Sequence, residues 1–143
     1  MVEYAVAFQE MAKEAGVNVE IERIPPDNFW SEGWMQTPFF TSNWNFRPSA
    51  DETLSLAYHS DAKWNEGEWR NPDMDALIEA ARAEADPDKR KELYAQAQQL
   101  LHDEGGVIIS YFKPYMLATR SNVKGFTPGA NTLLNLRDVS IET

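Results

Sequence analysis

Aromatic residues and polar residues that could hold a ligand alternate in one stretch of the chain, residues 39–75. The five tryptophans of the 143-residue chain all lie in this stretch or just before it: Trp30, Trp34, Trp44, Trp64 and Trp69. The large apolar body of a tryptophan must be covered by core, by a partner or by a ligand. Hydrogen-bonding groups stand among the rings: Asn43, Asn45, Arg47, Asp51, His59 and Asn65. Aromatic walls with a few polar groups are typical of small-molecule sites, so the stretch predicts non-covalent ligand binding.

Six residues of this stretch are the candidate ligand-binding residues: Trp44, Asn45, Phe46, Arg47, Tyr58 and Trp64. Trp44 ends a predicted strand, and the carboxyl ends of strands in an α/β sheet usually face the binding crevice. Arg47 has the same location and no obvious sequence neighbour to neutralise its charge. For each ring the alternative is that it covers the core, and for Arg47 that it is an exposed loop arginine.

Catalytic and metal-binding chemistry is poorly supported by the sequence. The only histidines are His59 and His102, there is no cysteine, and neither a metalloprotease spacing nor a glycine-rich phosphate loop occurs. His102 suits the end of a helix, and His59 could touch a ligand or stand on the surface. The carboxylates Asp73 and Asp75 fit the first turn of a helix better than a calcium loop. We therefore expect no enzyme, no metal and no cofactor.

The composition narrows the class of partner. A net charge of −10 and a pI near 4.6 argue against a nucleic-acid backbone or an anionic membrane as the main partner. Small molecules or proteins are the better candidates. No apolar run reaches the ~18 residues of a membrane helix, and the opening sequence lacks the pattern of a signal peptide.

The elements that would position the site read as a mixture of helices and strands. Apolar spacing predicts a helix over residues 2–15 that stops at Gly16, and Asn71–Pro72 and Asp86–Pro87 open two further helices, the second ending before Gly105. Residues 27–36 are a candidate for a short helix or turn, weakened by Gly33. Strands are predicted at residues 17–24, 39–44 and 107–112, and after Arg120 only residues 138–142 alternate. The expected fold class is α/β, with a small mixed sheet flanked by helices.

The order of these elements resembles a known family. It begins with Trp44 and "ADETL", continues with a helix carrying Asn71, Asp75 and Leu77 and a helix carrying Asp86, Arg90 and Tyr94, and ends with "VIISYF". This order resembles the carboxy-terminal part of the peptide/nickel/oligopeptide class of ABC-transporter solute-binding proteins. The resemblance spans nearly the whole chain.

The resemblance implies a partial lobe of a type II periplasmic-binding-protein fold. Residues 1–120 would be part of the second ligand-binding lobe, and residues 121–143 a tail that returns to a missing first lobe, with the signal peptide also in the missing part. It implies a periplasmic or extracytoplasmic receptor that binds a peptide or other small solute and presents it to a membrane permease, with no nucleic-acid partner. Without its first lobe, we expect the tail to be mobile or to pack on a second copy of the chain.

One position departs from the family pattern. Peptide-binding relatives commonly carry an aspartate three residues after the tryptophan, where it pairs with the amino terminus of the ligand, and Arg47 stands there in this chain. An arginine would favour a carboxylate or phosphate. Asp51 could take the amine instead, although capping the following segment is the alternative. The competing function is a free-standing protein-interaction module with an aromatic binding face.

Overall fold

The computed structural model of the chain describes residues 1–114, 116–129 and 134–142. It divides into two compact units, Met1–Trp44 and Asn45–Thr143. Among the described residues, no helix has the length and apolar character needed to cross a membrane.

The first unit opens with helix α1, Val2–Glu14, which confirms the predicted helix and its stop at Gly16. The helix ends in a double hydrogen-bond motif: the Gly16 nitrogen donates to the Lys13 carbonyl at 3.0 Å, and the Val17 nitrogen to the Ala12 carbonyl at 2.9 Å. Gly16 has φ +79°, a left-handed conformation that glycine adopts without strain. The sequence signal for the end of this helix was therefore sufficient.

A 3₁₀ turn, η1 (Pro26–Asn28), and a π-helical turn, η2 (Phe29–Gly33), follow in the same unit. They confirm the predicted short helix or turn. The turns stack aromatic rings edge to face: Trp30 contacts Phe29 and Trp34 at centroid distances of 5.2 and 5.4 Å, and Phe29 contacts Phe40 at 6.4 Å. Two of the five tryptophans are thus packed against each other.

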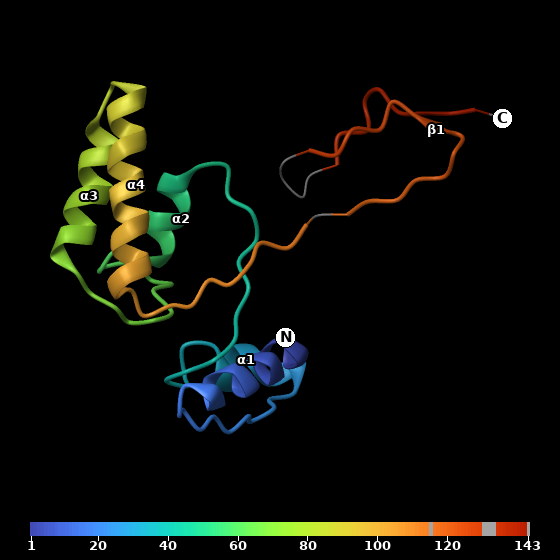
Figure 1. Cartoon of the computed structure of the whole chain (residues 1–143). Helices are drawn as coiled ribbons and strands as arrows, with labels where there is room; N and C mark the ends of the chain where they lie inside the picture. The colour runs from blue at the N-terminus through green and yellow to red at the C-terminus, as the bar shows by residue number, and fades with distance from the viewer. Residues whose placement is uncertain (115, 130–133, 143) are drawn as a thin grey trace. The chain divides into compact units, whose positions relative to one another are not determined.

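The second unit holds three helices, α2 (Ala50–Ala57), α3 (Pro72–Ala83) and α4 (Pro87–Glu104), which lie side by side in Figure 1. They enclose one core cluster, formed by Leu54, Met74, Ile78, Ala97 and Leu101. Both predicted helices of this part are confirmed, and α2 was not predicted. The apolar faces of the three helices meet at this core, so the burial of apolar side chains fixes the position of α2 against α3 and α4.

The starts of α3 and α4 follow the predicted capping chemistry. The Asn71 side chain accepts hydrogen bonds from the Asp73 and Met74 nitrogens at 2.9 and 3.3 Å. The Asp86 side chain accepts bonds from the Asp88 and Lys89 nitrogens at 2.9 and 3.3 Å. Each cap precedes a proline at the first helical position, where the missing N–H costs no hydrogen bond.

The predicted mixed sheet is wrong for the described part of the chain. Residues 17–24, 39–44 and 107–112 form no strand there, and the side chains of Ile108, Ile109, Tyr111 and Phe112 are more than half exposed instead of buried. β-branched and aromatic residues favour an extended backbone, but a strand also needs a neighbouring chain to complete the hydrogen-bond ladder. The sequence pattern shows which residues favour an extended backbone, but it does not show whether a neighbouring chain is available to pair with them.

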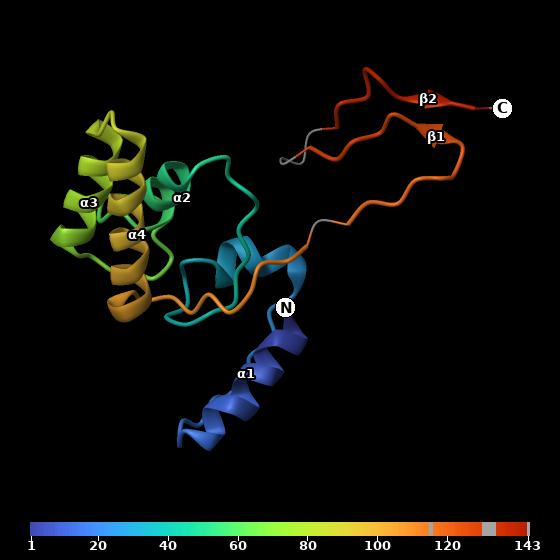
Figure 2. The same ribbon diagram turned by 45° about the horizontal axis from the view of Figure 1, so that its top comes forward.

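The one sheet within the described residues is a two-stranded antiparallel pair, β1 (Val123–Lys124) and β2 (Ser140–Ile141), seen in Figure 2. Val123 is opposite Ile141. Beyond the pair, the Glu142 nitrogen donates to the Asn122 carbonyl at 2.9 Å and the Asn122 side chain donates to the Glu142 carbonyl at 3.1 Å. The alternation predicted at residues 138–142 is confirmed by β2.

Candidate functional site

The guanidinium group of Arg47 organises the chain where it enters α2. Its Nε lies 3.4 Å from Oε1 of Glu52, and its Nη1 donates to the carbonyl oxygens of Asn45 and Phe46 at 3.4 and 3.3 Å. A partner for the charge of Arg47 was not obvious in the sequence, and the first turn of α2 supplies one by bringing Glu52 back to it. These hydrogen bonds fix the local conformation of three candidate residues, Asn45, Phe46 and Arg47.

The start of α2 explains why Glu52 occupies this place. Ser49 is the N-cap, and its hydroxyl accepts a hydrogen bond from the Glu52 nitrogen at 3.2 Å. Ser49 and Glu52 have the serine-x-x-glutamate spacing of a capping box. This signal, which the sequence analysis missed, could have predicted both α2 and Glu52.

Asp51 does not cap α2, contrary to the alternative that the sequence offered. Its Oδ1 lies 3.2 Å from Nε of Arg82 and accepts a hydrogen bond from the Ser55 hydroxyl at 3.2 Å. Because Arg82 belongs to α3, Asp51 instead ties the first turn of α2 to the neighbouring helix. Ser49 supplies the cap.

The remaining candidate residues differ in their surroundings. Phe46 and Trp64 are 55% and 42% exposed, so their rings can be reached from solvent. Tyr58 packs against the core cluster, and partial burial, together with the charge of Glu66, raises its pKa above the ordinary value. Trp44 is half-buried at the end of the first unit. Asn45 is exposed.

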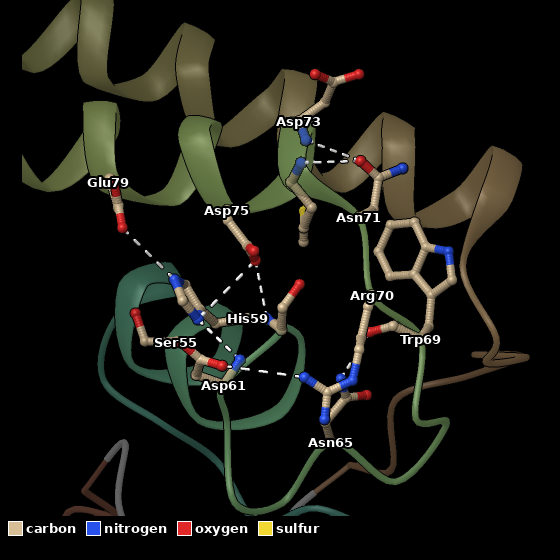
Figure 3. Close-up of polar contacts among 12 residues, drawn as sticks. Ser55, His59, Asp61, Asn65, Trp69, Arg70, Asn71, Asp73, Asp75 and Glu79 are labelled. Carbon is tan, nitrogen blue, oxygen red and sulfur yellow. Dashed lines mark hydrogen bonds and ion pairs between the residues drawn. The ribbon is translucent and has the colours of Figure 1, made fainter.

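The loop that carries Trp64 is held by contacts of the residues that follow it, one of which is drawn in Figure 3. The buried Asn65 donates from Nδ2 to the Trp69 carbonyl at 2.6 Å, and the Trp69 ring packs against the core cluster. At Gly67 an added Cβ would lie 3.0 Å from the carbonyl oxygen of Gly106. The loop is therefore held closely against the segment after α4.

His59 and Asp75 join the end of α2 to the start of α3 (Figure 3). The Asp75 carboxylate accepts a hydrogen bond from the Ser60 nitrogen at 2.8 Å and lies 3.9 Å from Nδ1 of His59. On its other side, Nε2 of His59 lies 3.7 Å from Oε1 of Glu79. These contacts give His59 a structural role, and the sequence analysis had not connected it with α3.

Among the described residues, no group of three or more histidine, aspartate or glutamate side chains is placed to hold a metal ion. The two ring nitrogens of His59 face two different carboxylates, so they do not converge on one point. His102 is exposed in the last turn of α4, where its Nδ1 lies 2.9 Å from Oδ1 of Asp103.

No protein-family model matches the chain. The chain is 31% identical over 124 residues to the dipeptide-binding protein DppE of Bacillus subtilis (strain 168), a match that covers 85% of this chain and 23% of DppE. It is 29% identical over 136 residues to the oligopeptide-binding protein OppA of Mycobacterium tuberculosis (strain ATCC 25618 / H37Rv), covering 94% of this chain and 23% of OppA.

A third relative is the probable D,D-dipeptide-binding periplasmic protein DdpA of Escherichia coli (strain K12), 27% identical over 144 residues, with 95% of this chain and 28% of DdpA covered. The chain thus spans about a quarter of the length of these relatives. Along most of its own length it is similar to peptide-binding proteins, one of which is named as periplasmic.

Proposed function

We propose that the chain is part of an extracytoplasmic solute-binding receptor of an ABC importer, which binds a peptide or another small solute non-covalently and delivers it to a membrane permease. The observation that carries this proposal is the similarity to OppA and DppE over 94% and 85% of the chain. The relatives are named as binding proteins. The polar groups of the candidate site could hold a solute by hydrogen bonds without reacting with it.

The proposed solute-binding segment comprises Trp44, Asn45, Phe46, Arg47, Tyr58 and Trp64. Exposed rings at Phe46 and Trp64 could cover apolar parts of a solute, and the Asn45 amide could orient it. In the longer protein, a closed cleft would complete the site from its other side. Arg47 is the residue of the segment that would meet a carboxylate or phosphate, but such a group must compete with Glu52 for it.

Calorimetry on the full-length gene product tests the proposal. Dipeptides, longer peptides, amino-terminally blocked peptides and sugar phosphates would be titrated in turn, and we expect saturable binding of one class. The matched variant Trp64→Ala should bind that solute more weakly, while Trp30→Ala, outside the proposed solute-binding segment, should not. Absence of binding to every class would contradict the proposal.

The arrangement of the longer protein belongs to the same proposal. Residues 1–120 would form part of one lobe, residues 121–143 would reach the other lobe, and export would place the protein in the periplasm or outside the cell. Fractionation of cells that express the full-length gene tests the location. Size-exclusion chromatography of the 143-residue chain, with and without residues 121–143, tests self-association through the tail.

A free-standing interaction module is the second candidate function, and the exposed aromatic residues favour it. Trp30, Phe39 and Phe112 are all well exposed, and aromatic residues are enriched at protein interfaces. The length of the natural gene product separates the two candidates. A product that begins at Met1 and ends at Thr143 would support the module and contradict the receptor.

A further inference from the structure

We infer that Glu52 sets the charge preference of the proposed solute-binding segment: it neutralises Arg47, so the segment selects solutes without net charge over anions. The effect on solute selection rests on the proposed function. The neutralisation of Arg47 by Glu52 does not depend on it.

The geometry of the pair supports this role. The Arg47 Nε and the Glu52 Oε1 are 3.4 Å apart, and the Arg47 Nη1 lies within hydrogen-bond distance of two main-chain carbonyls. The guanidinium is therefore oriented by main-chain acceptors as well as by the carboxylate. The Glu52 side chain is 42% exposed and the Arg47 side chain 24%, so the pair faces solvent along one side.

The start of α2 holds Glu52 in place. Glu52 is the third helical residue after the Ser49 cap, where the helix dipole favours a negative charge. An incoming carboxylate would have to displace this carboxylate from Arg47 and leave Glu52 unpaired in a chain of net charge −10. The exchange replaces the contact between Arg47 and Glu52 by a contact between Arg47 and the solute, so an anionic solute gains little binding free energy. A solute without net charge does not need the exchange.

Removal of the Glu52 charge should therefore create an anion site at Arg47. Glu52→Gln keeps the capping-box pattern, since glutamine is accepted at this position, and so preserves α2. The probe is acetate, titrated against the 143-residue chain while the Arg47 Nε–H resonance is followed by NMR. The resonance is assigned by its loss in Arg47→Lys. The pair is partly exposed, so we expect acetate to bind Glu52→Gln about two- to fivefold more tightly than the wild type.

The control is Glu92→Gln, which makes the same change of net charge at an exposed glutamate of α4. It should bind acetate at Arg47 as the wild type does. Equal acetate affinity at Arg47 in the wild type and Glu52→Gln would overturn the inference, as would an equal gain in both glutamine variants.

A second measurement separates this inference from the proposed function. In the full-length protein, Glu52→Gln should shift solute preference toward anionic solutes, such as amino-terminally blocked peptides. If no solute binds the full-length protein while acetate still distinguishes the variants, the receptor proposal fails and the charge role of Glu52 stands. If a solute binds and its charge preference is unchanged in Glu52→Gln, the inference fails and the receptor proposal stands.

Discussion

Asp75 holds Ser60: its Oδ1 accepts a hydrogen bond from the Ser60 backbone nitrogen at 2.8 Å, across 15 residues of sequence. The contact connects the turn that follows α2 with the first turn of α3. It also places the carboxylate beside His59. The loop that carries Trp64 begins at this point, so its position depends on the bond between this turn and α3.

Asp75→Ala should destabilise the second compact unit. The change leaves the Ser60 nitrogen without its acceptor and removes the carboxylate beside His59, so we expect a loss of about 1–3 kcal/mol in the free energy of unfolding. Urea unfolding followed by circular dichroism measures it. Asp73→Ala is the matched control, because Asp73 is an exposed carboxylate of the same helical turn. Equal losses in the two variants would assign the effect to the helix dipole instead of the bond.

Asn71→Ala should shorten or loosen the start of α3. The side chain satisfies the Asp73 and Met74 nitrogens, and loss of such a cap typically costs about 1 kcal/mol. Asn71→Ser, which keeps an acceptor oxygen and adds no charge beside Glu104, should retain most of the stability. Hydrogen exchange at the Asp73 and Met74 amides checks the mechanism: unchanged protection in Asn71→Ala would contradict it.

Helix ends were the part of the fold that the sequence predicted best, because their signals are local. Asn71 and Asp86 each precede a proline, and Gly16 supplies a left-handed residue. The predicted strands failed for the opposite reason. A strand at residues 107–112 depends on a ladder partner elsewhere in space, and no residue pattern within the segment identifies that partner.

The pairings of the candidate residues could not be predicted from the sequence. The sequence also left open whether the rings of Phe46 and Trp64 are exposed, and both are accessible. It did not pair Arg47 with Glu52, because the pairing requires α2 to begin at Ala50. The contact between His59 and α3 was missed because it joins residues distant in sequence.

Alkaline pH should destabilise the fold through Tyr58. Partial burial raises the pKa of this phenol, and the nearby charge of Glu66 adds to the effect. The unfolded state loses its proton at its ordinary pKa of about 10, while the folded state keeps it. The stability that the neutral phenol supplies is therefore complete below about pH 10 and is lost as the pH rises through the folded pKa.

Tyr58→Phe tests this pH dependence, since it keeps the ring in the core and removes the ionising group. Urea unfolding at about pH 9 and about pH 10.5 should show a smaller loss of stability in Tyr58→Phe than in the wild type. Burial and Asp51 also raise the pKa of Tyr94, so part of the loss should remain in the variant. Tyr111→Phe, at an exposed tyrosine, is the control. The same loss in the wild type and Tyr58→Phe would exclude Tyr58 as the source.

Trp64→Ala should weaken solute binding by the full-length protein without unfolding it. The ring is 42% exposed, and the bond from the Asn65 side chain to the Trp69 carbonyl does not involve it. Loss of one aromatic contact with a solute typically corresponds to about 0.5–1.5 kcal/mol beyond the buried area, or roughly a two- to tenfold rise in Kd. Calorimetry measures the affinity, and circular dichroism checks the fold. Trp30→Ala removes a more exposed ring that lies outside the proposed segment. An equal loss of affinity in both variants would mean that general aromatic exposure, and not the proposed segment, determines binding.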